Sequence, residues 1–261
     1  MARGKESRRK VQLRDVVLGS GRPALILPLV PRNLRELQEM TEEALNCRPD
    51  ILEWRADYFE EVEDCERVKE ALALLRKMAG NSAILVTPRH VEENGVRAIG
   101  PEKKKEILRC VIQSRLADMV DVELRYEADF HAELRQLCRE NGIALMISYH
   151  DLEGTPEEEE IIRKLQQEME RGADVCKVSF VAQNYGDIWR LGHAIRKAKE
   201  EEIPIPVVSI SAGSLGTLSR IGAEAFGSDG TFVSVGRTHQ IHIEDLRILR
   251  KDLGLEEEKE V

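Results

Sequence analysis

Thr155-Pro-Glu-Glu-Glu-Glu-Ile-Ile-Arg-Lys-Leu-Gln-Gln-Glu-Met-Glu-Arg-Gly172 is followed two residues later by Asp174-Val-Cys-Lys-Val-Ser-Phe180. The first segment predicts an amphipathic helix, because Ile161, Leu165 and Met169 recur at helical spacing and acidic residues fill the first turn. The second segment is a short apolar run that contains one lysine, and it predicts a buried strand. A helix followed directly by a buried strand is the repeating unit of parallel α/β proteins.

The same unit repeats along the whole chain. Apolar runs rich in Val, Ile and Leu predict eight strands, at 24–30, 50–54, 83–87, 119–124, 144–149, 174–180, 206–210 and 231–235. Helical patterns separate these runs, at 33–46, 64–78, 102–116, 130–140, 155–172, 188–198, 216–225 and 243–253. Eight such units in 261 residues favour a (β/α)8 TIM barrel, with a doubly wound open sheet as the alternative. We therefore expect a single α/β domain over 1–261, with a strand or hairpin at 10–19 and flexible tails at 1–9 and 256–261.

The composition excludes several classes of protein. Hydrophobic residues make up 42% of the chain, which is enough for a core and rules out a disordered chain. The net charge of −9 argues against nucleic acid or an anionic membrane as a partner. No apolar run reaches the roughly 18 residues of a membrane helix, and the first ten residues lack the apolar segment of a secretory signal. We expect a cytoplasmic protein with no metal and no cofactor, and reduced thiols at Cys47, Cys65, Cys110, Cys138 and Cys176.

The alternation of side chains within the strands predicts a polar cluster. In a barrel, one parity of each strand faces the lumen and the other faces the helices. Active sites of this fold lie at the C-terminal ends of the strands. We expect the polar parity of the six central strands to converge there in one pocket. This parity contains Glu53, Arg55, Thr87, Arg89, Asp121, Glu123, Ser148, His150, Lys177, Ser179, Ser209 and Ser211.

Lys177 is the most informative member of this set, because lysine is uncommon in the middle of an apolar strand. In a structural interpretation, its side chain pairs with Asp174 or extends toward solvent. In a functional interpretation, its amine lies near Arg55 and Arg89, reacts as a nucleophile and forms a Schiff base with a carbonyl substrate. The residues alone leave both interpretations open.

His150 also allows two interpretations. It forms a hydrogen bond with Asp151 at the end of its strand, or it works as a general acid and base near neutral pH. In the second case an inward carboxylate, such as Glu93 or Glu123, orients the imidazole ring. The residues alone do not decide between them.

The remaining charged residues are ambiguous in the same way. Glu53 and Arg55 either form an internal salt bridge or bind a substrate. Arg89 and Arg220 offer bidentate forks for a carboxylate or phosphate, although Arg220 also fits an exposed helix position. The run Lys103-Lys-Lys105 predicts a solvated helix face.

Several short segments, in this order and spacing, resemble the type I 3-dehydroquinate dehydratases from about Val16 to Leu253. They are Asp50-Ile-Leu-Glu-Trp-Arg-Ala-Asp57, Thr87-Pro-Arg89 with Glu93 and Gly95, Val120-Asp-Val-Glu-Leu124, Ser148-Tyr-His-Asp151 with Thr155-Pro156, Ala173-Asp-Val-Cys-Lys177, Leu218-Ser-Arg-Ile221 and Ala225-Phe-Gly-Ser228. The resemblance implies a hydro-lyase that converts 3-dehydroquinate to 3-dehydroshikimate in the shikimate pathway of aromatic amino acid biosynthesis, and it implies a homodimer.

The resemblance also implies roles for individual residues. Lys177 would form an imine with the substrate ketone, and His150 would remove the neighbouring proton and later protonate the leaving hydroxyl. Glu93 would be the carboxylate partner of the histidine. The implied substrate-binding residues are Glu53, Arg55, Arg89, Arg220 for the substrate carboxylate, and Gln240 on a closing loop.

The run Gly236-Arg-Thr-His-Gln240 stands where this family usually has Ser-Ala-Pro-Gly-Gln or a close variant. Loops of this kind exclude water and complete a site. The departure keeps two alternatives open. One is another Schiff-base lyase, such as a class I aldolase, and the other is a barrel that binds a ligand without catalysis.

Overall fold

The structure, a computed structural model, describes residues 9–236 and 240–255. Within these residues the core strands are β3 (Ala24–Leu29), β4 (Ile51–Arg55), β5 (Ala83–Thr87), β6 (Met119–Glu123), β7 (Ala144–Asp151), β8 (Val175–Val181), β9 (Val207–Ala212) and β10 (Gly230–Phe232). The helices are α1 (Leu34–Asn46), α2 (Cys65–Ala79), α3 (Pro101–Ser114), α4 (Ala128–Asn141), α5 (Glu158–Glu170), α6 (Tyr185–Glu201), α7 (Thr217–Ile221) and α8 (Ile243–Asp252). The predicted tails lie outside the described residues, except for Arg9.

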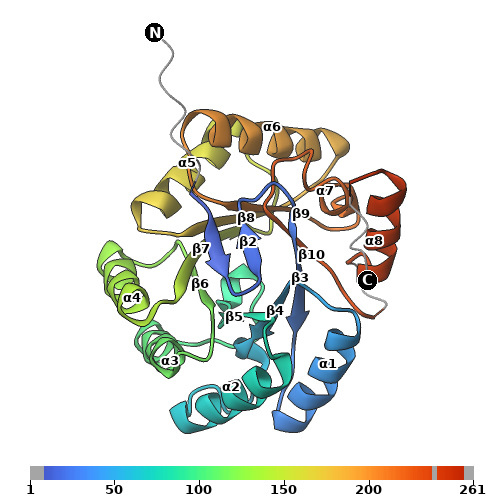
Figure 1. The fold of residues 1–261 in the computed structure, drawn as a ribbon. Helices are drawn as coiled ribbons and strands as arrows, with labels where there is room; N and C mark the ends of the chain where they lie inside the picture. Colours follow the sequence, from blue (N-terminus) through green and yellow to red (C-terminus); the bar gives the residue numbers. More distant parts are fainter. Residues whose placement is uncertain (1–8, 237–239, 256–261) are drawn as a thin grey trace.

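The strands form one parallel sheet that curves into a nearly closed barrel, with the helices around its outside (Figure 1). The order of strands in the sheet is β10-β3-β4-β5-β6-β7-β8-β9, so β3 to β9 lie side by side in chain order and β10 pairs with β3. The predicted single-domain α/β TIM barrel is confirmed, and the open-sheet alternative is wrong.

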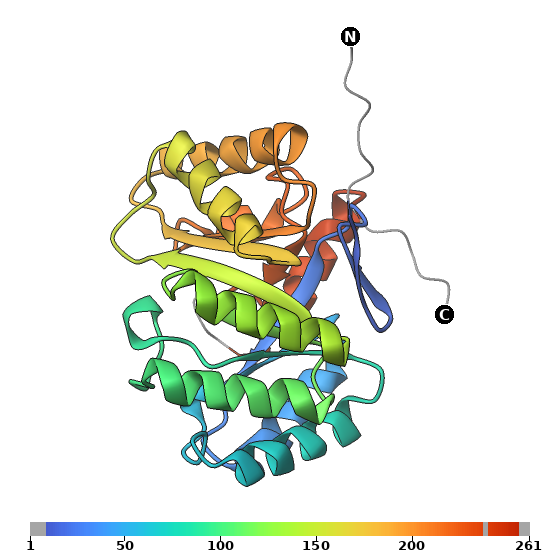
Figure 2. The ribbon, with the colours of Figure 1, turned by 90° about the vertical axis from the view of Figure 1, so that its left-hand side faces the viewer.

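A short antiparallel hairpin precedes the barrel, as 10–19 predicts. It consists of β1 (Val11–Leu13) and β2 (Val16–Leu18). Leu13 and Leu18 are buried in a cluster with lumen residues of the core strands, such as Met146. Figure 2 shows the hairpin at the opposite end of the barrel from the loop that follows β7. The hairpin therefore covers the N-terminal end of the lumen and leaves the C-terminal end available for a site.

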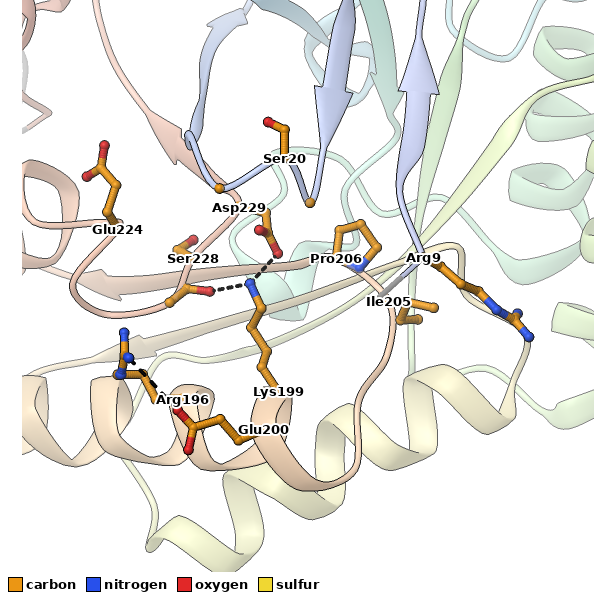
Figure 3. Close-up of a pocket in the computed structure, with 13 residues that line it drawn as sticks. Arg9, Ser20, Arg196, Lys199, Glu200, Ile205, Pro206, Glu224, Ser228 and Asp229 are labelled. Carbon is orange, nitrogen blue, oxygen red and sulfur yellow. Dashed lines mark hydrogen bonds and ion pairs between the residues drawn. The ribbon is translucent and has the colours of Figure 1, made fainter. Parts of the chain in front are cut away.

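The barrel closes between β9 and β10 through Asp229. Its backbone N–H donates to the carbonyl oxygen of Val207 at 2.7 Å, and its carboxylate accepts the Val207 N–H at 2.8 Å. Nζ of Lys199 on α6 binds the same carboxylate at 2.7 Å. The pair lies beside a cavity of about 260 Å³ at the N-terminal end of the barrel (Figure 3). The carboxylate of Asp229, which lines this cavity, therefore helps to connect β9 and β10.

The predicted division of the strands into two faces holds from β4 to β8 and is wrong for β9. Leu52, Trp54 and Val122, for example, pack in the helix layer as expected. In β9, however, Val208 and Ile210 belong to the lumen cluster. Ser209 and Ser211 therefore take the outer face. Val208 lies beside Lys177 in the register of β8 and β9 and so shares its face.

Two helix predictions need correction at their ends. Helix α5 begins at Glu158 instead of 155, because the Thr155 hydroxyl donates to the carbonyl oxygen of Val181 at 3.1 Å and holds this segment outside the helix. Helix α7 covers only Thr217–Ile221 of the predicted 216–225.

The expectation that all five cysteines are reduced is also wrong in this structure. Cys65 on α2 and Cys110 on α3 form a disulfide, while Cys47, Cys138 and Cys176 are free. The two partners are 45 residues apart, and only the packing of α2 against α3 brings them together. In the described parts of the chain, no helix is both long and apolar enough to cross a membrane.

Candidate active site

A cavity of about 160 Å³ opens at the C-terminal end of the barrel. Side chains from the ends of β4, β5, β7 and β8, from α7 and from the loop after β10 line it. The structure brings together in this one place the eight residues to which the resemblance gives a catalytic or binding role. They are Lys177, His150, Glu93, Glu53, Arg55, Arg89, Arg220 and Gln240.

Lys177 points into the lumen from β8 and is almost fully buried. Its Nζ lies 2.9 Å from Oδ2 of Asp121 and 3.8 Å from Oε1 of Glu53. The same ammonium group lies over the ring of Phe232, 4.8 Å from its centroid. The proposed pairing with Asp174 is not observed, because that carboxylate binds Arg135 and the Leu145 N–H instead.

Asp121 connects Lys177 to Arg89 in a buried network. Nη2 of Arg89 binds Oδ2 of Asp121 at 2.5 Å, and Nη1 binds the Ser148 hydroxyl at 2.8 Å and Glu123 at 3.2 Å. Burial alone would raise the pKa of Asp121, but the positive charges of Arg89 and Lys177 hold it well below its usual value. Asp121 therefore stays ionised and holds both cations in place.

The sequence places Asp121 in the polar set that converges on the pocket, but neither its chemistry nor the resemblance gives it a catalytic or binding role. The signal was present, because Asp121 shares its parity with Glu123 in an otherwise apolar strand. The sequence does not give the register between the strands. In the structure, Asp121 on β6 lies beside Met146 on β7, and Ser148, two residues farther along β7, lies beside Lys177 on β8.

His150 and Glu93 form a pair at the mouth of the cavity. Oε2 of Glu93 lies 3.0 Å from Nδ1 of His150 and also accepts the His150 backbone N–H at 3.1 Å. Burial and the positive charges of Arg89 and Lys177 hold the pKa of His150 well below its ordinary value. Burial, together with the negative charge of Glu123, raises the pKa of Glu93 to about 7. When Glu93 is ionised, a neutral His150 donates from Nδ1 and leaves Nε2 as a base.

The turn after β5 places Glu93 in this position. Asn94 has a left-handed backbone with φ of 71°, and the Gly95 N–H donates to the carbonyl oxygen of His90 at 2.9 Å. A Cβ atom at Gly95 would lie 2.3 Å from the carbonyl oxygen of Arg89. The tight turn therefore requires glycine at this position.

Two arginines of the cavity differ in whether their N–H groups have hydrogen-bond partners. Arg55 binds Asp57 through two hydrogen bonds, at 2.8 and 2.9 Å. In Arg220, by contrast, Nη1 is buried without a hydrogen-bond partner among the described residues. Burial lowers the pKa of Arg220 to about 10, which still leaves it charged at neutral pH. The exposed position considered for Arg220 is wrong, and its free donor suits an anionic ligand.

The prediction that Lys103, Lys104 and Lys105 form a solvated face is wrong for the middle residue. Lys104 is fully buried, and its Nζ binds Oε2 of Glu123 at 2.6 Å. Spacing along the helix explains the difference, because Lys104 precedes the buried residues Ile107, Leu108 and Val111 on the inner face of α3.

Residues 237–239, where the loop departs from the expected pattern, lie outside the described residues. Gln240 is described and lines the cavity. Among the described side chains, no group of three or more His, Cys, Asp or Glu residues is placed to hold a metal ion.

Comparisons with known proteins agree on one family. A family model described as type I 3-dehydroquinase matches residues 25–255. The 3-dehydroquinate dehydratase of Geobacillus sp. (strain WCH70) is 37% identical over 246 residues, which cover 92% of this chain and 94% of that protein. The 3-dehydroquinate dehydratase of Syntrophotalea carbinolica is 36% identical over 240 residues, 91% of this chain and 95% of that protein.

Solved structures give the same result. The type I 3-dehydroquinate dehydratase from Clostridium difficile, with covalent modified comenic acid, has a TM-score of 0.92 and 30% identity, and the match covers 95% of this chain and 98% of that one. The 3-dehydroquinate dehydratase from Geobacillus kaustophilus has a TM-score of 0.91 and 30% identity, with coverage of 95% and 97%.

Among the described residues, Arg89 has ion-pair partners and Nη1 of Arg220 has none, so replacing these two buried arginines should affect the free energy of unfolding differently. Arg89→Met leaves Asp121 and Glu123 without their shared cation, so we expect a loss of about 3–5 kcal/mol in the free energy of unfolding. Arg220→Met removes a buried charge whose Nη1 has no partner, so we expect unchanged or slightly increased stability. Urea unfolding of both variants measures the contrast, and a large loss for Arg220→Met would contradict it.

Proposed function

The chain belongs to the type I 3-dehydroquinase family, a family of hydro-lyases, and from this premise we propose that it dehydrates 3-dehydroquinate to 3-dehydroshikimate through a Schiff base on Lys177. One observation carries the proposal. The Lys177 amine, the His150–Glu93 pair and the unpaired donor of Arg220 all line the same cavity. An amine, a neutral base and an anion-binding group are what this reaction requires.

The first step is imine formation at Lys177. Its amine attacks the substrate ketone, the carbonyl oxygen leaves as water, and a C=N bond replaces the C=O bond. The resulting iminium carries a positive charge where the ammonium group now lies. Asp121 at 2.9 Å and Glu53 at 3.8 Å offset this charge in a buried site.

His150 then moves the protons. The iminium acidifies the neighbouring carbon, so Nε2 of a neutral His150 removes a proton and the electron pair moves onto the imine nitrogen. The electrons return to expel the β-hydroxyl group, which takes the proton from His150 and leaves as water. Hydrolysis of the imine consumes one water, restores the lysine and releases the enone.

Binding of the substrate falls to the other residues of the cavity. Nη1 of Arg220 takes the substrate carboxylate, since it is a buried donor that belongs to this cavity and has no hydrogen-bond partner among the described residues. Glu53 and Arg55 face the same space and bind hydroxyl groups, while Arg89 contributes from the edge of its network with Asp121. Gln240 contacts the substrate from the loop after β10.

The alternatives receive less support from the site. A class I aldolase would cleave a carbon–carbon bond, whereas relatives at 37% and 36% identity are 3-dehydroquinate dehydratases. A non-catalytic barrel does not account for a lysine, a histidine and a carboxylate that remain together in one cavity. Membership of this dehydratase family supports a place in the shikimate pathway. The homodimer stays a prediction from the resemblance, and the cytoplasmic location stays a prediction from the sequence.

Replacing the lysine tests the proposed chemistry. Lys177→Met keeps the length of the side chain but has no amine, so we expect turnover of 3-dehydroquinate to fall by at least about a thousandfold while the protein stays folded. Enone absorbance measures turnover and circular dichroism measures folding. Lys103→Met is the matched control, because Lys103 is only half-buried and its ion pair among the described residues is with Glu106 on its own helix. A folded Lys177→Met variant with full turnover would exclude the imine.

The His150–Glu93 pair predicts the pH dependence. The pKa of Glu93 is about 7, and the pKa of His150 lies well below its ordinary value. As the pH falls through about 7, Glu93 therefore takes up a proton while His150 is still neutral, and the pair loses the carboxylate that orients the ring. We expect kcat/KM to fall below this pH and the Glu93→Gln variant to lose this acid limb. An acid limb that is unchanged in Glu93→Gln would assign it to another group.

A further inference from the structure

Lys104 is a buried cation that lies outside the cavity. It sits on α3, and its side chain is fully buried, although its neighbours Lys103 and Lys105 form ion pairs with Glu106 and Glu133 nearer the surface. Burying a lysine is costly unless its charge is paired. The contacts of Lys104 therefore indicate what the charge is used for.

Lys104 contacts the site through one carboxylate, that of Glu123. Its Nζ binds Oε2 of Glu123 at 2.6 Å and lies over the ring of Tyr126, 5.3 Å from the centroid. The other oxygen of Glu123, Oε1, accepts the His90 N–H at 2.6 Å and binds Nη1 of Arg89 at 3.2 Å. Glu123 thus has one oxygen toward the helix layer and one toward the site.

We propose that Lys104 is a positioning residue for the dehydratase site, which acts through Glu123 to hold Arg89 and the His90–Glu93 turn and to offset the negative charge beside Glu93. This inference rests on the proposed function. Lys104 itself does not line the cavity, so it touches no substrate. Its effect reaches the site because Glu123 is shared between Lys104, Arg89 and the backbone of His90.

The charges around Glu93 show why the offset matters. Burial alone would raise the pKa of Glu123, but Lys104 and Arg89 lower it, so Glu123 remains ionised. The negative charge of Glu123 is, after burial, the largest influence that raises the pKa of Glu93. The charged and titratable groups that act on Glu93 or the His150 paired with it are Arg55 on β4, Arg89 after β5, Asp121 and Glu123 on β6, Arg125 and Tyr126 after β6, His150 and Tyr149 on β7, Glu168 on α5 and Lys177 on β8.

Removing the positive charge of Lys104 should shift the pKa of Glu93 in a defined direction. Glu123 would then be offset by Arg89 but no longer by Lys104, and its negative charge would act more strongly on Glu93. The pKa of Glu93 would rise further, so Glu93 would lose its proton only at higher pH. The acid limb of kcat/KM would therefore move upward.

The test compares Lys104→Met with Lys103→Met in complete pH profiles of kcat and kcat/KM for 3-dehydroquinate. For Lys104→Met we expect an acid limb about one pH unit higher, which lowers kcat/KM by about fivefold at pH 7 and is the size of a remote coupling. The pH profiles of Lys103→Met should match those of the wild-type protein. If Lys104→Met does not fold, Lys104→Gln replaces it, because glutamine still donates to Glu123 but carries no charge.

A second variant separates charge from packing. Lys104→Met combined with Glu123→Gln removes both charges and leaves a group that can still accept the His90 N–H. We expect this double variant to return the acid limb to, or below, its original pH. An unchanged pH profile in Lys104→Met, with only a lower melting temperature, would overturn the proposal. If the wild-type protein does not turn over 3-dehydroquinate at all, the proposed function itself is refuted.

Discussion

The site depends on the buried contact between Asp121 and its two cations, Lys177 and Arg89. A carboxylate, an amine and a guanidinium inside a barrel are stable only when they satisfy one another. Asp121 meets this requirement, since Oδ2 lies 2.9 Å from Nζ of Lys177 and 2.5 Å from Nη2 of Arg89. The barrel makes the contact possible, because β6, β8 and the segment after β5 all direct these side chains into the lumen, across the intervening β7. Without Asp121, Lys177 would keep only the more distant carboxylate of Glu53, at 3.8 Å, among the ion pairs of the described residues.

The same network explains the protonation states of the groups around it. Burial, together with the two cations, depresses the pKa of His150, so the imidazole is a neutral base in a site that is otherwise crowded with charge. Glu93 lies among carboxylates and is buried, so it ionises near neutral pH. Environment thus separates the roles of chemically similar carboxylates: Asp121 is a permanent anion, and Glu93 titrates. One set of charges therefore both stabilises the lumen and prepares the base.

Much of this arrangement follows from the sequence, and the exceptions have physical causes. The strands and their order follow from apolar runs that alternate with helical patterns along the chain, and the inward residues of β4 to β8 follow from the period of two within each strand. The same rule fails in β9, where Val207-Val-Ser-Ile-Ser211 alternates between small polar and apolar residues that suit either face. Lys104 was missed because three consecutive lysines hide which one faces inward. The disulfide between Cys65 and Cys110 and the partners of Asp121 depend on contacts between distant segments, which spacing alone does not encode.

The central claim is that the Lys177 amine forms an imine with 3-dehydroquinate. The most direct measurement is incubation of the protein with 3-dehydroquinate and borohydride, followed by intact mass and peptide mapping. The account predicts a reduced adduct on Lys177, and enone absorbance when borohydride is omitted. A folded protein that gives neither the adduct nor the enone would contradict it.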